Sequence, residues 1–144
     1  MLIREMQIND IDFLSELYFQ FWGEKSNVEK MQGKFSQLQN NSAYIFLCAV
    51  ENERVVGSVM GIVCEELYGD CQPFLVLENM VVDNNCRRKG VGKLLCAELE
   101  KQAKERGCSQ ILLVTKSNRE DACRFYESLG FNPAANMGFK KKIN

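Results

Sequence analysis

Residues 86–95 read CRRKGVGKLL. Three consecutive basic residues come first, two glycines one residue apart follow them, and an apolar run then begins. The chain as a whole is slightly acidic, with a net charge of −1 and an isoelectric point of about 5.6. The segment follows LENMVVD (77–83), which has strand character, and leads into VGKLLCAELEKQAKER (91–106), which has helical spacing. A helix N-terminus presents unpaired N–H groups and a positive dipole end. We therefore expect phosphate or pyrophosphate to bind here; an ordinary basic turn is the alternative.

The rest of the chain favours an α/β domain with a mixed sheet. Strands are expected over residues 2–8, 44–51, 54–66, 73–83 and 110–116, with a closing strand or hairpin over 131–143. Helices are expected over 11–22, 27–40, 90–106 and 119–130, with glycines at 23, 107 and 130 as stops. Asn9 or Asp10 is expected to cap the first helix. The strands on either side of the 90–106 helix should be parallel, because that helix is a crossover.

Composition narrows the class of protein. The 144 residues suit a single domain over 1–144, and a hydrophobic content of 46% can build one core. The chain has no run of about 18 apolar residues, and its charged N-terminal segment is unlike a signal peptide, so we expect a cytoplasmic protein that does not enter a membrane. Seven cysteines at unpaired spacings and no histidine predict reduced thiols and no metal site. Acid–base chemistry then has to come from carboxylate, tyrosine, cysteine or lysine groups.

Charge is divided unevenly along the chain. Residues 1–72 carry 11 acidic and five basic side chains, whereas residues 73–144 carry eight acidic and 13 basic ones. This division favours two ligands of opposite charge over a nucleic-acid surface, which would be basic overall. A random distribution over a solvated surface is the alternative.

Two other phosphate-binding motifs do not match the glycine turn. The dinucleotide fingerprint G-x-G-x-x-G is absent, and the next strand ends in TKSN (115–118) without the acidic residue that the fingerprint requires. The G-K-[ST] ending of the NTPase phosphate loop is also absent, because Leu94 follows Gly92 and Lys93. Both of these nucleotide-binding classes are therefore disfavoured.

Two segments together resemble the GNAT superfamily of acyl-CoA-dependent N-acyltransferases. The family signature of Arg or Gln, two residues, Gly, one residue and Gly or Ala stands here as RRKGVG (87–92). The block NREDACRFYESLGF (118–131) is similar to the family's helix after the next strand. The resemblance is close over residues 74–131 and extends to the rest by element order. It implies one mixed sheet of about six to seven strands flanked by about four helices.

The resemblance also implies that the chain binds acetyl-CoA. The backbone N–H groups of the signature would hold the pyrophosphate, and the preceding strand would take the pantetheine arm like an added strand. The Met80 N–H would polarise the thioester carbonyl as an oxyanion donor. Asn118 resembles the family position that contacts the pantetheine arm, and an ordinary turn residue is the alternative for it. The expected cofactor-binding residues are Met80, Val81, Val82, Arg87, Arg88, Lys89, Gly90, Val91, Gly92, Lys93, Asn118 and Tyr126.

Two side chains are predicted to be catalytic. Glu78 interrupts the apolar run FLVLENMVV (74–82), and family members often carry a carboxylate there, so it is the candidate base that deprotonates the amine. Tyr126 resembles the family tyrosine that protonates the leaving thiolate. A solvent-facing or ion-paired role is the alternative for Glu78, and a core aromatic is the alternative for Tyr126. A covalent route through Cys123 is disfavoured.

The acceptor is expected to bind on the acidic half of the chain. Tyr18, Trp22, Glu24 and Glu78 are the predicted substrate-binding residues. Aromatic and acidic walls favour a cationic amine such as a polyamine or an aminoglycoside, with lysine or N-terminal amines also open. Tyr18 and Phe21 match the buried face of their helix as well, so core packing is the alternative for them.

The leading hypothesis is an acetyl-CoA-dependent N-acetyltransferase that acts on a small-molecule or peptide amine by direct attack in a ternary complex. The second is a non-catalytic acyl-CoA-binding regulatory module. The third, a nucleic-acid-binding domain using the basic residues of 87–93 and 140–142, is opposed by the acidic isoelectric point. Many family members dimerise through sheet edges, which makes a homodimer a candidate assembly.

Overall fold

The computed structural model describes residues 1–144, which form two compact units, Met1–Leu112 and Leu113–Asn144. In chain order the first unit holds β1 (Leu2–Glu5), a 3-10 turn η1 (Ile8–Asp10), α1 (Ile11–Trp22), α2 (Val28–Leu38), β2 (Tyr44–Glu51), β3 (Arg54–Cys64), β4 (Phe74–Val82), a 3-10 turn η2 (Asn84–Cys86), α3 (Val91–Glu105) and β5 (Ile111–Leu112). The second unit holds one helix, α4 (Glu120–Ser128). All four expected helices are present, and one domain over 1–144 stays a prediction.

One five-stranded sheet in the order β1-β2-β3-β4-β5 organises the first unit. The strands from β1 to β4 pair antiparallel, whereas β5 pairs parallel with β4 at Leu75–Ile111 and Val76–Leu112. The expected α/β class, mixed sheet and parallel crossover are therefore confirmed. The number of strands is lower than expected, because β5 ends after two residues and residues 131–143 form no strand.

The last segment forms a turn and irregular chain in place of the expected closing strand. The Asn132 side chain accepts hydrogen bonds from the N–H groups of Ala134 at 2.9 Å and Ala135 at 3.2 Å, which closes a turn around Pro133. A side chain that bonds its own backbone offers an alternative to ladder pairing. A strand also needs a partner to be stable, and residues 131–143 have no paired strand.

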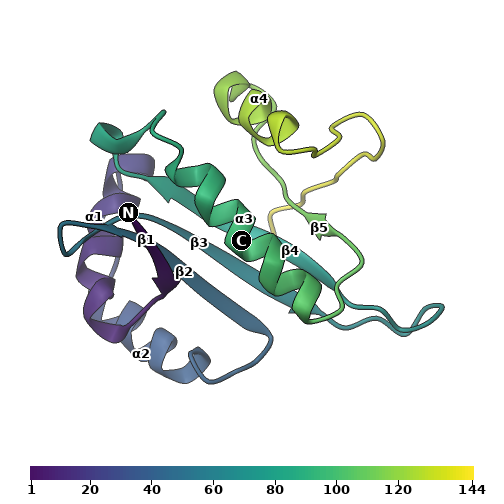
Figure 1. Ribbon diagram of the computed structural model, residues 1–144, viewed down its shortest axis with the longest axis horizontal. Helices are drawn as coiled ribbons and strands as arrows, with labels where there is room; N and C mark the ends of the chain where they lie inside the picture. The colour runs from purple at the N-terminus through teal and green to yellow at the C-terminus, as the bar shows by residue number, and fades with distance from the viewer. The chain divides into compact units, whose positions relative to one another are not determined.

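Helices cover both faces of the sheet in the first unit. α3 runs across one face, and α1 and α2 pack against the other (Figure 1). On the α3 face, an added Cβ atom on Gly57 would lie 2.8 Å from Val91 Cγ1, and one on Gly61 would lie 2.7 Å from Leu99 Cδ1. The two glycines therefore let α3 approach β3 closely. None of the helices is both long and apolar enough to cross a membrane.

We expect Gly57→Ala to destabilise the fold. The new methyl group would meet Val91 and Leu95 and would lie 3.3 Å from the carbonyl oxygen of Val81. Overpacking of this kind costs about 1–3 kcal/mol, measured as a lower midpoint of urea unfolding. Gly33→Ala is the matched control, because an added Cβ there meets nothing within 4 Å and alanine favours the helix. Equal destabilisation by the two substitutions would contradict the close approach of α3.

The side-chain cap expected from Asp10 at the start of α1 is absent, whereas the glycine stop expected at its end is present. The Asp10 carboxylate accepts hydrogen bonds from Arg4 Nη1 at 2.7 Å, Arg4 Nη2 at 2.9 Å and the Gln7 N–H at 2.7 Å, and it caps no N–H of α1. Burial by itself raises the pKa of Asp10, but the hydrogen bonds from Arg4 and Gln7 outweigh burial and lower that pKa. Asp10 therefore ties β1 to the turn before α1. At the other end, Gly23 adopts φ +73° and its N–H donates to the Phe19 carbonyl, as expected for a glycine stop.

The seven cysteines are free thiols, of which Cys48, Cys86 and Cys96 are buried and Cys71 is exposed. Burial raises the pKa of Cys48 to about 12 and that of Cys96 to about 11. Both thiols therefore stay protonated at neutral pH and behave as small apolar side chains.

Candidate functional site

A β-bulge interrupts β4 immediately after Glu78. The register of β4 against β3 shifts between Ser58 and Met60, so that Asn79 and Met80 together occupy one position of the ladder. Asn79 has a φ of +52°, a left-handed conformation that residues other than glycine seldom adopt. A bulge redirects the main-chain groups around its extra residue, and strained backbone of this kind is concentrated at functional sites.

The edge of β4 beside the bulge is open. β5 pairs with Leu75 and Val76, whereas β4 continues to Val82. From Leu77 onward, this side of β4 has no neighbouring strand. A free strand edge can bind an extended ligand through main-chain hydrogen bonds, as an added strand would bind. The residues predicted to hold the pantetheine arm, Met80 to Val82, lie on this open segment.

Glu78 lies on the face of the sheet that α1 and α2 cover. It pairs with Met60 on β3, which pairs with Phe46 on β2, and directly opposed residues share a face. Phe46 packs against the core that α1 and α2 form with the sheet. The Glu78 side chain itself is exposed. A carboxylate is therefore available to a ligand on this face, next to the bulge.

The turn between β4 and α3 has the geometry of an anion-binding loop. Arg88 and Gly90 adopt left-handed φ values of +62° and +82°, and no side chain caps the N-terminus of α3. The first N–H groups of α3 therefore lack partners within the helix. Successive N–H groups in turns with left-handed residues form concave anion sites. The side chains of Arg87, Lys89 and Lys93 are exposed around this turn, as is that of Arg88, so the structure brings the predicted pyrophosphate-binding residues together.

A side chain from α1 anchors the start of this turn. Asp83 is only 6% exposed, and its carboxylate accepts hydrogen bonds from the Asn85 N–H at 2.8 Å and from Gln20 Nε2 at 3.1 Å. The side-chain oxygen of Gln20 in turn accepts from the Asn84 N–H at 3.1 Å. The Asn85 N–H, followed by Gln20, lowers the pKa of Asp83. Gln20 and Asp83 are not predictable from the sequence, because their contact joins distant segments and leaves no local pattern.

We expect Gln20→Leu to lower the free energy of unfolding by about 1–2 kcal/mol at pH 7, because two hydrogen bonds are lost and the buried Asp83 carboxylate loses a donor. The lowered pKa of Asp83 means that its contribution to stability is present above the unfolded value and is lost as pH falls through the folded value. The difference between the two proteins should therefore shrink below about pH 4.

Urea unfolding at neutral and acidic pH measures this difference. Gln37→Leu is the control, since Gln37 lies exposed on α2 and should change stability by less than about 0.5 kcal/mol. A destabilisation by Gln20→Leu that stays constant down to about pH 3 would show that Asp83 is not its cause.

The side chains predicted to contact the acceptor lie at and just beyond the end of α1. The ring of Trp22 contacts Tyr18 at a centroid distance of 5.1 Å and Phe21 at 4.5 Å, and Trp22 is 50% exposed. Glu24 follows the helix and is exposed. Burial raises the pKa of Tyr18 to about 12, partly offset by a hydrogen bond with the Asn79 side chain. The structure thus groups Tyr18 with Trp22, and Glu24 is exposed just beyond the end of the helix.

Asn118 and Tyr126 belong to the second unit. Asn118 is exposed in the turn before α4. Tyr126 is half-buried on α4, and its ring contacts Phe125 at 5.1 Å and Phe131 at 5.7 Å. The functional roles expected for Asn118 and Tyr126 stay predictions.

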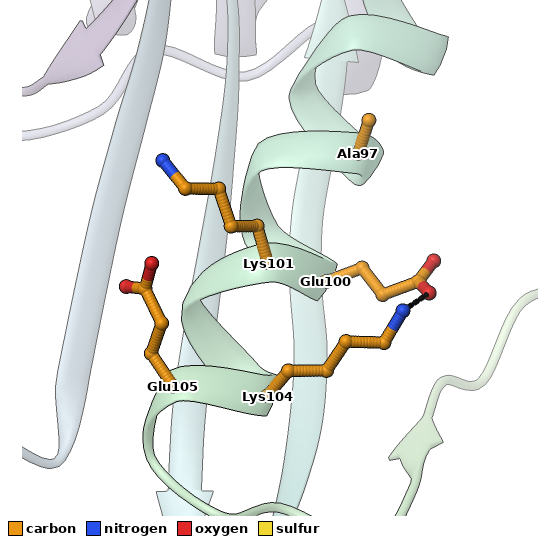
Figure 2. Close-up of a pocket in the computed structure, with 5 residues that line it drawn as sticks. All are labelled: Ala97, Glu100, Lys101, Lys104 and Glu105. Carbon is orange, nitrogen blue, oxygen red and sulfur yellow. Dashed lines mark hydrogen bonds and ion pairs between the residues drawn. The ribbon is translucent and has the colours of Figure 1, made fainter.

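Two hollows on the first unit do not coincide with this site. One, of about 430 Å³, lies on the surface of α3, where the lining residues all come from that helix and Lys104 Nζ is ion-paired with Glu100 at 2.6 Å (Figure 2). The other, of about 440 Å³, lies beside α1 and includes Gln20 and Lys25. Neither is lined by a predicted site residue. The candidate site is therefore the bulge, the open edge of β4 and the basic turn.

Comparison with known proteins agrees with this geometry. The model of the family described as "Acetyltransferase (GNAT) family" matches residues 11–131. The chain is 30% identical over 110 residues to the "Probable glucosamine 6-phosphate N-acetyltransferase" of Drosophila melanogaster, a match that covers 73% of this chain and 48% of that relative. It is 36% identical over 58 residues to the ribosomal protein bS18-alanine N-acetyltransferase of Escherichia coli K12, covering 40% of this chain and 39% of that relative.

The fold is shared with a solved enzyme structure. Glucosamine-6-phosphate N-acetyltransferase from Arabidopsis thaliana superposes with a TM-score of 0.86 over 99% of this chain and 98% of that one, at 21% identity. The chain spans less than half the length of the two curated relatives. The family match nevertheless extends from α1 to just past α4, and both parts of the family signature lie within it. The chain therefore belongs to the acetyltransferase (GNAT) family.

Proposed function

We propose that the protein is an N-acetyltransferase that transfers an acetyl group from acetyl-CoA to a primary amine by direct attack in a ternary complex. The observation that carries this proposal is the continuous path along β4, from the bulge beside Glu78, along the open edge, to the basic turn before α3. Family membership supports the same conclusion.

The turn fits the diphosphate of coenzyme A. Unpaired N–H groups at the start of α3 and the cationic side chains of Arg87, Arg88, Lys89 and Lys93 suit a multiply charged anion. The open edge from Met80 to Val82 suits the amide groups of the pantetheine arm, and Asn118 is the proposed further contact. When bound, acetyl-CoA supplies the acyl group in the activated form of a thioester.

Three groups of the chain are proposed to promote transfer. An alkylammonium has a pKa of about 10.4, so Glu78 removes a proton from the acceptor, directly or through a water molecule. The Met80 N–H donates a hydrogen bond to the carbonyl oxygen as negative charge develops there. Tyr126 donates a proton to the departing thiolate.

The proposed acceptor is a cationic molecule that carries a primary amine. Glu78 lies on the sheet face covered by α1, and α1 presents the half-exposed Trp22 and is followed by the exposed Glu24. Carboxylate and aromatic groups attract a cation by charge and by cation–π contact. The two curated relatives are named as a probable glucosamine 6-phosphate N-acetyltransferase and a ribosomal protein bS18-alanine N-acetyltransferase, so their named acceptors differ widely. A small polycation is the first acceptor to test, and peptide amines are the second.

Thermal unfolding with acetyl-CoA tests the cofactor. Ligand at roughly 100 times its dissociation constant adds about 2.7 kcal/mol, which raises the midpoint by about 4 °C or more. ATP and NAD serve as controls and should cause smaller shifts. An amine panel, with products identified by mass, then tests transfer. A thermal shift with acetyl-CoA but no acetylated product would favour a non-catalytic acyl-CoA-binding module, and the lack of any acyl-CoA shift would overturn the proposal.

A further inference from the structure

Each main-chain N–H group of residues 83–86 donates a hydrogen bond. The first, that of Asp83, donates to the Val56 carbonyl of β3 at 2.8 Å, and the last donates to the Asp83 carbonyl at 2.9 Å. The two between them donate to side-chain oxygens, one of Gln20 at 3.1 Å and one of Asp83 at 2.8 Å. This short segment is therefore fixed to β3 by its main chain and to α1 through Gln20.

The main chain changes character immediately after this segment. Arg88 and Gly90 take left-handed φ values of +62° and +82°, and the first N–H groups of α3 have no partner within the helix. The position of this turn therefore depends on the elements at its two ends, which are α3 and the segment 83–86. That segment is the fixed base from which the proposed diphosphate-binding turn extends.

Gln20 is the part of this base that comes from a distant element. Its side-chain amide uses both ends, because Nε2 donates to Asp83 at 3.1 Å and Oε1 accepts from the Asn84 N–H at 3.1 Å. The Asp83 carboxylate is only 6% exposed. A negative charge shortly before the turn works against the binding of an anion. The hydrogen bonds that Asp83 accepts, and not its charge, therefore account for a carboxylate at this position.

We propose that Gln20 and Asp83 are positioning residues for the cofactor, which hold residues 83–86 so that the N–H groups at the start of α3 meet the diphosphate of acetyl-CoA. This inference rests on the proposed acetyl transfer, in which that turn binds the cofactor. A positioning role of this kind changes the affinity for acetyl-CoA and leaves the chemical step at Glu78 largely unchanged.

Three variants of the protein test the pair. Gln20→Leu removes both hydrogen bonds of the amide. Asp83→Asn keeps the size of the side chain, but it cannot accept from both Gln20 and the Asn85 N–H, because one end of its amide is a donor. The third variant carries both changes.

Each single substitution should raise the Kd for acetyl-CoA by about three- to tenfold, measured by isothermal titration. The kcat at saturating acetyl-CoA and the KM for the amine should stay within about twofold of wild type. The double variant should lose less than the product of the two single losses, because both substitutions break the same network.

Two control variants separate positioning from stability. Gln37→Leu makes the same chemical change on α2, where the side chain is exposed. Ile45→Val shortens a buried side chain of β2, in register with Gly61, and should destabilise the fold about as much as Gln20→Leu does. Both controls should leave the Kd for acetyl-CoA within about twofold of wild type, because neither side chain belongs to the network.

A second readout requires neither ligand nor turnover. The chain has ten glycines, so selective 15N-glycine labelling gives a simple amide spectrum in which Gly92→Ala identifies the Gly92 signal. Gly92 lies in the first turn of α3, and its N–H is one of the groups proposed to meet the diphosphate. Gln20→Leu and Asp83→Asn should shift the Gly92 signal, and the two controls should not.

The outcomes separate the two levels of the argument. A wild-type protein that binds no acetyl-CoA overturns the proposed function. A Gly92 signal unmoved by Gln20→Leu overturns the positioning of the turn, whatever the affinity. An unchanged Kd in Gln20→Leu, an equal rise in Kd in Ile45→Val, or single losses that multiply in the double variant overturn the positioning role while leaving the proposed function intact.

Discussion

Glu78→Gln lowers kcat for amine acetylation by about 100-fold or more, because loss of a general base typically costs 10²–10⁴-fold in rate. The substitution keeps the size of an exposed side chain next to the bulge, so the Kd for acetyl-CoA and the thermal midpoint should stay close to those of wild type. Initial rates at saturating amine, followed by the mass of the product, measure the effect.

The pH dependence of the Glu78→Gln rate is a second test of the proposed base. Without the base, the variant depends on amine that has already lost its proton, so its rate should rise about tenfold per pH unit up to the amine pKa of about 10. Glu105→Gln, an exposed carboxylate at the end of α3, is the control and should behave as wild type. If Glu78→Gln weakened acetyl-CoA binding as much as it slowed turnover, Glu78 would have a structural role and the proposed base would be wrong.

Gly90→Val raises the Kd for acetyl-CoA by about tenfold or more. Gly90 has a φ of +82° at the N-cap of α3, and a β-branched side chain is strongly disfavoured in that conformation. An added Cβ at Gly90 meets nothing within 4 Å, so the expected effect comes from the backbone alone. A turn that relaxes to negative φ would redirect the N–H groups at the start of α3 away from the diphosphate.

Isothermal titration with acetyl-CoA measures this Kd, and Gly33→Ala in α2 is the control that should leave it unchanged. Arg88 offers an internal comparison, because it also has a left-handed φ, +62°, without being glycine. Arg88→Gly should relieve backbone strain but remove a charge, so we expect a gain in stability with weaker binding. An unchanged Kd in Gly90→Val would show that the turn does not hold the cofactor.

The sequence by itself determined the parts of this protein that depend on local pattern. The basic glycine turn, the amphipathic α3 after it and the glycine that ends α1 follow from residue type and spacing, and the structure confirms them. The parallel pairing of β4 with β5 also follows, because a strand, a helix and a strand in succession leave one common arrangement. The closing strand or hairpin expected over residues 131–143 was wrong, because the Asn132 side chain closes a turn around Pro133 there.

Only the tertiary structure decided how the candidate site is held. Residues 74–82 read as an apolar strand that Glu78 and Asn79 interrupt, and the bulge at Asn79 becomes visible only in the register of β4 against β3. The hydrogen bonds of Gln20 with Asp83 and Asn84 join α1 to the turn that follows β4. Hydrogen bonds of this kind depend on where separate elements pack. Gln20 and Asp83 are each compatible with a solvent-exposed position in their own segments, so no local pattern distinguishes them until the chain has folded.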